Sequence, residues 1–359
     1  MKVGISVLAI GVMALVAAPA LAQTASTAEE ILRAWLTSPH ANAETEAFRH
    51  WDAEGEIPGD CAVCHSTTGV IDYLANPANV AGVIDHPVST GTTVECAACH
   101  NPAAEALQDV VFPSGQVVTM TGDAAICTVC HQGRAYSGTV DAALDGLADD
   151  TVSDKITFIN IHYAAAAATQ LGGVAQGGYE YPGQSYKGVF EHVEGFDTCV
   201  NCHDPHATKV VLDTCNSCHE GATDFRDIRT TPMDILGRGD TTSGIATVID
   251  DLRGLLKTAL MTYAAQVSGT AIVYSSTAYP YFFNDLNANG ALDAGEASYP
   301  NRYQSWTPRL LRAAYNYQFV SKDPGAFAHN PHYSIQLLFD SLTDLGTAAA
   351  VDLTGLVRP

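Results

Sequence analysis

The stretch Cys61-Ala-Val-Cys64-His65 decides how this chain is built, because it is the first of five Cys-x-x-Cys-His motifs. The other four begin at Cys96, Cys127, Cys199 and Cys215, and the five motifs use all 10 cysteines of the 359-residue chain. Two thiols one helical turn apart suit the two vinyl groups of one haem, and the adjacent histidine supplies a nitrogen to the iron. The pattern therefore predicts five covalently attached haem c groups.

The predicted attachment residues are Cys61, Cys64, Cys96, Cys99, Cys127, Cys130, Cys199, Cys202, Cys215 and Cys218, and the predicted proximal iron ligands are His65, His100, His131, His203 and His219. A secreted disulfide scaffold or a series of zinc sites would also use many cysteines. Neither alternative explains why a histidine follows every second cysteine. An odd number of Cys-x-x-Cys pairs also fits poorly with zinc sites, which usually combine two such pairs.

The histidine count bears on the sixth coordination position of each iron. Of the 13 histidines, five belong to the motifs and eight remain, whereas methionine, the alternative sixth ligand, occurs only five times. We therefore expect bis-histidine coordination. The candidate distal ligands are His40, His50, His162, His192, His206 and His329, with His86 and His332 as weaker candidates. Six candidates for five irons leave one that is wrong or that binds a haem of a neighbouring molecule.

The region after the last motif has the clearest helical patterns. Apolar residues recur every three or four positions from Ile245 to Tyr263. Two further helices are predicted to begin at Thr307-Pro308 and at Asn330-Pro331, because each pair combines a capping side chain with a proline suited to the first turn.

Elsewhere the local signals are weaker. Ser38-Pro39 predicts a helix over residues 40–51, and residues 109–120 predict one hairpin at most, with a Pro-Ser-Gly turn at 113–115. The haem-bearing segments otherwise read as loops and short helices. We therefore expect a mostly α, irregular, haem-packed fold with little β structure and a helical C-terminal region.

A twelve-residue segment of this C-terminal region matches the calcium-loop pattern. It reads Asp285-Leu-Asn287-Ala-Asn289-Gly290-Ala291-Leu-Asp293-Ala-Gly-Glu296. The predicted ligands are the side chains of Asp285, Asn287, Asn289, Asp293 and Glu296 and the carbonyl of Ala291. A turn that binds no ion is the alternative. We expect one structural Ca²⁺.

The N-terminus and the charge bear on location and partners. Residues 1–22 combine Lys2, an apolar run and Ala20-Leu21-Ala22, which predicts a signal peptide and a periplasmic or extracellular protein without stable membrane insertion. The net charge of −22 disfavours nucleic acid and anionic lipid as partners. The predicted organisation is a signal peptide (1–22), a pentahaem region (23–220) and a haemless helical region (221–359), carrying the calcium loop and packed on the haem region.

The chain resembles the multihaem c-type cytochromes of exported bacterial respiratory chains. The five motifs, the Cys-His-Asp-Pro-His of residues 202–206 and His329-Asn-Pro-His-Tyr333 carry the likeness. The last segment is similar to a helix start in pentahaem and octahaem nitrogen-cycle cytochromes, where the first histidine is a distal ligand; the resemblance implies that role for His329. The Cys-x-x-Cys-Lys catalytic motif of pentahaem nitrite reductases does not occur in this sequence.

Three functions fit this sequence. The leading expectation is an electron carrier between redox proteins, without an enzymatic activity of its own. The first alternative is an oxidoreductase that acts on a small nitrogen or sulfur compound at one five-coordinate haem. The second is a homo-oligomer or filament that conducts electrons outside the cell, in which a spare histidine binds a haem of the next subunit.

Overall fold

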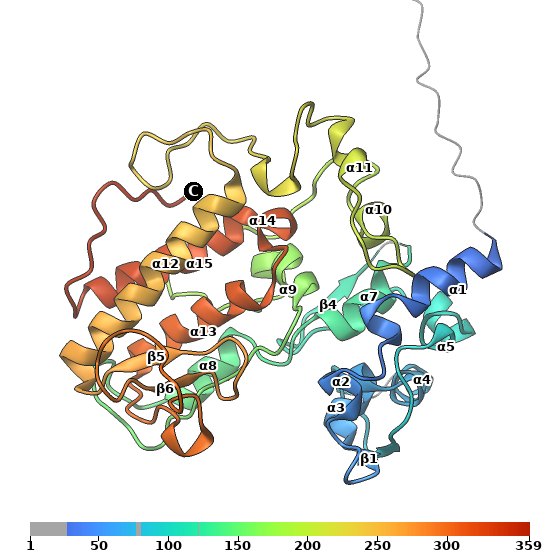
Figure 1. Cartoon of the computed structure of the whole chain (residues 1–359), viewed down its shortest axis with the longest axis horizontal. Helices are drawn as coiled ribbons and strands as arrows, with labels where there is room; N and C mark the ends of the chain where they lie inside the picture. The colour runs from blue at the N-terminus through green and yellow to red at the C-terminus, as the bar shows by residue number, and fades with distance from the viewer. Residues whose placement is uncertain (1–26, 77–79, 121) are drawn as a thin grey trace, which may run out of the picture.

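A computed structural model describes residues 27–76, 80–120 and 122–359, so the predicted signal peptide lies outside the described residues. The described chain is mostly helical, and its strands form three two-stranded antiparallel sheets. This confirms the predicted mostly α, irregular fold. In Figure 1 the helices α12 to α15 gather on one side, and the segments with the first two motifs lie on the other.

The elements up to the third motif are mostly short. They are α1 (Ala28–Leu36), η1 (Pro39–Ala41), α2 (Glu46–Arg49), β1 (Glu56–Ile57), α3 (Gly59–His65), α4 (Thr67–Ala75), β2 (Val88–Ser89), α5 (Cys96–Cys99), α6 (Pro102–Glu105), β3 (Asp109–Val111), β4 (Val117–Thr119) and α7 (Ala124–His131). The later elements are α8 (Ser137–Leu144), α9 (Ala166–Leu171), η2 (Gly172–Val174), α10 (Cys199–Cys202), α11 (Leu212–Asn216), η3 (Phe225–Asp227), α12 (Ile245–Tyr263), η4 (Ala264–Ser268), β5 (Ile272–Tyr274), β6 (Phe282–Asn284), η5 (Tyr299–Asn301), α13 (Pro308–Lys322), α14 (Ala326–His329) and α15 (Pro331–Gly346).

The three long C-terminal helices are those predicted from the sequence. α13 begins after Thr307, whose hydroxyl accepts a hydrogen bond from the Leu310 amide, and α15 begins after Asn330, whose side chain accepts from the Tyr333 amide. Each cap satisfies an amide that the first turn leaves unpaired. α12, α13 and α15 pack against one another and bury leucines from every helix, including Leu252 and Leu338. These helices therefore form the densest part of a hydrophobic core that also includes Val63 and Val129 from the motif segments.

The chain between the third and fourth motifs takes part in this helical body. Asn316 on α13 accepts a hydrogen bond from the Tyr179 amide at 2.6 Å and donates one to its carbonyl at 2.9 Å, and the Gly178 amide donates to the Tyr333 hydroxyl at 3.0 Å. A Cβ added at Gly178 would stand 2.3 Å from Leu337. Glycine is needed here because the backbone lies directly on α15.

Two sequence expectations need correction. The helix expected over 40–51 is broken into η1 and α2, because the Asn42 side chain accepts from the Glu44 amide at 3.1 Å and forms a turn between them. The predicted hairpin is present as β3 and β4. The strand pairs β1–β2 and β5–β6 are additional, so the expectation of at most one hairpin was wrong. Strands of two or three residues are too short to give a period-two signal.

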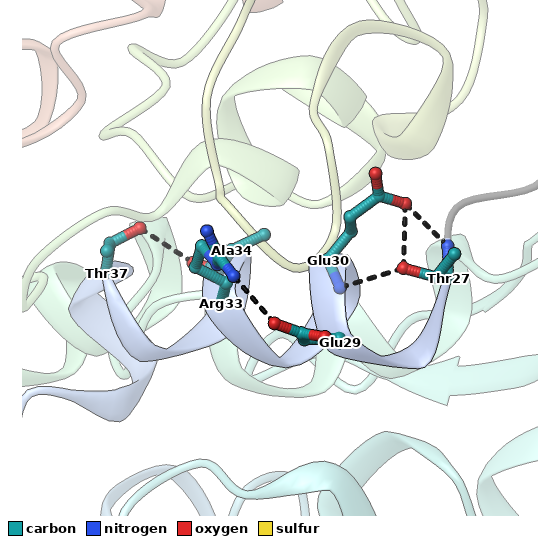
Figure 2. A pocket seen from close by; sticks show the side chains of 6 residues that line it. All are labelled: Thr27, Glu29, Glu30, Arg33, Ala34 and Thr37. Carbon is teal, nitrogen blue, oxygen red and sulfur yellow. Dashed lines mark hydrogen bonds and ion pairs between the residues drawn. The ribbon is translucent and has the colours of Figure 1, made fainter.

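Helix α1 is an exposed element at the start of the described chain. Figure 2 shows its capping box, in which Thr27 and Glu30 bond to each other's backbone amides. An Arg33–Glu29 ion pair of 2.8 Å follows one turn later, and α1 buries none of its residues. Within residues 27–76, 80–120 and 122–359, no helix is both long and apolar enough to cross a membrane.

Candidate haem-iron centres

The five motifs lie on or beside short helices. Motif residues occupy the end of α3, all of α5, the end of α7, all of α10 and the end of α11 with the residues after it. Helical geometry puts cysteines three residues apart on one face, with the following histidine one position further on. All 10 cysteines are free, and each is at least partly exposed. The motifs therefore present their thiols in the arrangement that attachment to one haem requires.

Each motif histidine has the ring of one histidine from outside the motifs close to its own. We call these the five histidine pairs. Their ring centroids are 5.7 Å apart for His65–His162, 6.1 Å for His100–His206, 6.4 Å for His40–His131, 6.3 Å for His203–His329 and 6.0 Å for His192–His219. No residue occurs in two pairs.

These separations fit two imidazoles on opposite sides of one metal. A metal–imidazole bond is about 2 Å long, so two nitrogens in line through one ion are about 4 Å apart. Each ring centroid lies a little over an ångström behind its nitrogen, which gives a centroid separation of about 6 Å. The Nε2 atoms of His65 and His162 are 3.4 Å apart. By the separation of their rings, the residues present therefore fit a six-coordinate haem iron at each pair.

The Nδ1 atoms of three paired histidines have hydrogen-bond acceptors. Nδ1 of His65 lies 2.7 Å from the Ala47 carbonyl, and Nδ1 of His131 lies 2.8 Å from that of Ala164. Nδ1 of His329 lies 2.8 Å from a carboxylate oxygen of Asp323. An acceptor at Nδ1 holds the proton there and leaves the Nε2 lone pair free for a metal.

Burial favours the neutral rings that metal binding needs. It lowers the pKa of His40, His65 and His203, and it lowers the pKa of His162 to about 4. In His329 burial acts in the same direction, but the Asp323 carboxylate outweighs it and raises the pKa.

The remaining candidate distal ligands lie differently. The ring of His50 packs on Trp51 with centroids 4.8 Å apart, and its Nδ1 contacts Glu46 at 2.7 Å. His86 has Asp85 at 2.8 Å and Asp72 at 3.3 Å, one on each ring nitrogen. His332 is exposed on α15. In the described part of the chain, none of these three rings forms a pair with a motif histidine.

Contacts between motifs connect the pairs. The Cys64 and Cys130 thiols interact, as do those of Cys127 and Cys199, so α7 with the third motif lies beside both α3 and α10. The third motif and the first also share the segment 162–164, since His162 faces His65 and the Ala164 carbonyl binds His131.

The second motif lies close to the fourth. His203 belongs to one pair and His206 to another, and three residues span at most about 11 Å of chain. The pairs containing His100 and His203 are therefore neighbours. The fifth motif lies close enough to the fourth for Cys215 to act electrostatically on Cys202.

The twelve-residue loop follows directly after β6. Asp285 and Glu296 are buried, and their oxygens accept hydrogen bonds from the amides of Gly290 at 2.7 Å and Leu286 at 2.8 Å. Gly290 has φ +78°, the left-handed conformation that the sixth position of such a loop needs.

The side-chain oxygens of this loop do not all point towards one common centre. The side-chain amides of Asn287 and Asn289 both donate to Asp293, at 2.7 and 2.8 Å. Among residues 27–76, 80–120 and 122–359, no three His, Cys, Asp or Glu side chains are close enough to hold a metal ion. Calcium binding would therefore require both asparagines to turn their oxygens inward.

Two further residues near the pairs were missed by sequence reasoning. Asp323 contacts His329, and Lys322 lies over Tyr163, the residue after His162. Both stand at the end of α13, outside any motif. No sequence pattern identifies them, because their role depends on which histidines the fold brings beside α13.

Comparison with known proteins links this geometry to a class of proteins. The chain is 26% identical to the C-type polyheme cytochrome OmcB of Geobacter sulfurreducens, over 82% of this chain and 45% of that protein. It is 27% identical to the C-type polyheme cytochrome OmcC of the same species, over 91% of this chain and 48% of that protein. The chain thus spans about half the length of these relatives.

The other two comparisons add no relative. No protein-family model matches the chain, and no solved structure matches it. The similarity to the two Geobacter proteins nevertheless extends over most of the chain. It confirms the predicted resemblance to the multihaem c-type cytochromes as a distant similarity.

Proposed function

We propose that this protein is an exported pentahaem c-type cytochrome that carries electrons between redox partner proteins. The observation that carries the proposal is that each of the five motif histidines faces a different histidine from elsewhere in the chain. The names of the Geobacter relatives, which describe C-type polyheme cytochromes, support it. Haem, when bound at these pairs, would supply one-electron chemistry.

The chain's own residues would hold and enclose the five groups. The motif cysteines would supply two thioether bonds per haem, and the two histidines of each pair would hold the iron. An iron held by two histidines would have no site left for a substrate. We therefore propose electron transfer in preference to catalysis, and we assign the distal ligands to His40, His162, His192, His206 and His329.

The contacts between motifs support transfer within one molecule. Thiols of the first and third motifs interact, thiols of the third and fourth interact, and the second motif's His100 faces a residue three positions after His203. Haems attached at neighbouring motifs would lie close together. A connected series of this kind would give electrons a route between two ends of the protein.

The two alternatives have less support. An oxidoreductase would need a motif histidine without a partner, and in the described chain all five have one. A filament that relies on ligands from a neighbouring molecule would need a spare distal histidine. His50 is the remaining candidate, and its ring packs on Trp51 with a centroid distance of 4.8 Å.

Electron paramagnetic resonance of the oxidised holoprotein tests the proposal. We expect only low-spin ferric signals and no change in the haem spectrum on addition of cyanide or nitrite. A high-spin signal that accounts for one haem of five, together with a cyanide-induced shift, would instead support the oxidoreductase.

We also propose that the loop from Asp285 to Glu296 binds one structural Ca²⁺. The loop matches the ligand pattern at every required position, and no ion pair involves Asp285, Asp293 or Glu296 within residues 27–76, 80–120 and 122–359. Calcium should raise the melting temperature of the chelator-treated protein, and an Asp285→Asn variant should lose this response. An equal response in the variant would rule out the site.

Two parts of the proposal concern location and partners. The signal-peptide pattern of residues 1–22 supports a periplasmic or extracellular location. The net charge of −22 would favour redox partners with basic docking surfaces and would repel nucleic acid. Edman sequencing of the mature protein should begin near Gln23, and an uncleaved N-terminus would contradict this assignment.

A further inference from the structure

Helix α13 ends in two consecutive buried residues of opposite charge. Lys322 is the last residue of the helix and is 7% exposed, and Asp323 follows it and is 3% exposed. Neighbouring residues at a helix end point in different directions. The Asp323 carboxylate contacts one histidine pair, and the Lys322 ammonium contacts Tyr163, whose ring lies beside another pair.

Asp323 acts on the pair His203–His329. Its two carboxylate oxygens lie 2.9 and 2.8 Å from Nδ1 of His329, and the Gly325 amide fixes the carboxylate with a hydrogen bond of 3.0 Å. A carboxylate at Nδ1 makes the imidazole a more basic ligand than a carbonyl does. A buried negative charge and a more basic ligand both stabilise ferric over ferrous iron.

The other two hydrogen-bonded pairs provide a contrast. His65 and His131 have backbone carbonyls of Ala47 and Ala164 at Nδ1, which are neutral acceptors. Within the described residues, His329 is the paired histidine that has a carboxylate within 3.0 Å of a ring nitrogen. The His203–His329 pair therefore differs from these two in the charge placed on its distal ligand.

Lys322 acts on the pair His65–His162. Its Nζ lies 3.3 Å from the ring centroid of Tyr163 and 3.8 Å from that of Tyr281, and it has no hydrogen-bond partner in the described structure. The ring of Tyr163 is 5.6 Å from that of His162. The Lys322 carbonyl also accepts a hydrogen bond from the Ala164 amide at 3.1 Å, which holds this segment against α13.

The lysine keeps its charge under ordinary conditions. Burial lowers its pKa to about 8, so the ammonium group is mostly protonated at pH 7. The faces of the two tyrosine rings partly replace the water that the ammonium loses. A buried positive charge beside a haem favours the ferrous state, because reduction removes one positive charge from the iron.

We propose that Asp323 and Lys322 shift the potentials of two haem sites in opposite directions, lowering that of the His203–His329 site and raising that of the His65–His162 site. This inference rests on the proposed function, since it requires haem at both pairs. Electrons would then reside preferentially at the first motif. The two residues at the end of α13 would thereby favour electron flow towards the haem at the first motif.

The test is a redox titration of the holoprotein in which individual haems are resolved by paramagnetic resonance and nuclear magnetic resonance. Asp323→Asn should shift one haem about tenfold towards the reduced form, which is about 59 mV for one electron. Lys322→Met should shift a different haem in the opposite direction, by about threefold to tenfold. Asp323→Glu, which keeps the charge, should stay close to the wild type.

Matched controls separate charge from general disturbance. Asp340→Asn removes another buried carboxylate, eleven residues after His329 and bonded to Arg358 at 2.8 Å, and Lys257→Met removes a lysine of α12. Neither control should move a potential.

Three results would overturn the inference: unchanged potentials in both test variants, shifts of the same haem, or an Asp323→Glu shift as large as that of Asp323→Asn. Failure of the proposed function would look different. It would appear in the wild type, as fewer than five haems or as high-spin iron.

Discussion

The segments that carry the fourth and fifth motifs are packed differently from the C-terminal helices. α13 buries almost its whole length and packs on α12 and α15, whereas α10 and α11, which carry the fourth and fifth motifs, bury no residue. Apolar side chains fill the interior around the C-terminal helices, and α3 and α7 contribute Val63 and Val129 to the same hydrophobic cluster. Around α10 and α11, haems attached at the fourth and fifth motifs would supply the buried surface that side chains do not supply.

The largest expected consequence of this difference appears when haem is withheld. In the full-length chain produced without haem attachment, amide hydrogen exchange should become fast in α10 and α11, which bury no residue. It should stay slow in α12, α13 and α15, because their burial involves protein side chains only. The holoprotein serves as the reference, in which both regions should be protected. Equal loss of protection in both regions would show that the C-terminal core also depends on haem.

A cavity in the C-terminal core should destabilise the protein without changing the haem sites. Leu338→Ala removes a fully buried side chain of α15 and should cost about 2–5 kcal/mol of unfolding free energy. The matched control is Leu36→Ala at the end of α1, where the leucine is 61% exposed, and its cost should stay within about 0.5 kcal/mol. Denaturant unfolding followed by circular dichroism measures both. An altered haem spectrum in folded Leu338→Ala would contradict this expectation.

His329 connects the two regions, so its removal should affect one haem. His329→Ala should convert one haem of five to a high-spin or ligand-exchangeable form, because His203 loses the ring that faces it. His50→Ala should leave all haems low-spin, because His50 packs on Trp51. Paramagnetic resonance of the oxidised variants measures the difference. The pairing would be wrong if His50→Ala produced the high-spin signal and His329→Ala did not.

A smaller effect should appear in the pH dependence of stability. Burial raises the pKa of Glu180 from 4.5 to about 7 although the Tyr333 hydroxyl donates to it at 3.0 Å. The folded chain therefore binds this proton more tightly than the unfolded chain, and Glu180 makes stability fall as pH rises from about 4.5 to about 7.

Replacing the carboxyl group tests this dependence. Melting temperatures of the wild type and Glu180→Gln, measured between pH 4.5 and 7.5, should diverge in the variant's favour as pH rises. Parallel curves would show that Glu180 does not contribute.

The parts of the fold that could be predicted are those with a local physical cause. Thr307-Pro308 and Asn330-Pro331 marked the starts of α13 and α15 because capping is decided within four residues. The break at Asn42 could not be foreseen, since a side-chain turn competes there with a helix of similar local preference.

The candidate site shows the same limit. The motifs name the proximal histidines directly, and the histidine count limits the distal candidates to a few residues. Which candidate faces which motif depends on long-range packing, as in His162 facing His65 across 97 positions of sequence. Asp323 and Lys322 were missed for the same reason, because only the fold brings them beside paired histidines.

Above all, we propose that five histidine pairs hold five low-spin haems. The most direct test combines intact-mass determination of the purified holoprotein with paramagnetic resonance of its oxidised form. We expect a mass increase of five haem groups and low-spin ferric signals from all the iron. Fewer than five attached haems, or a high-spin signal equivalent to one haem or more, would contradict it.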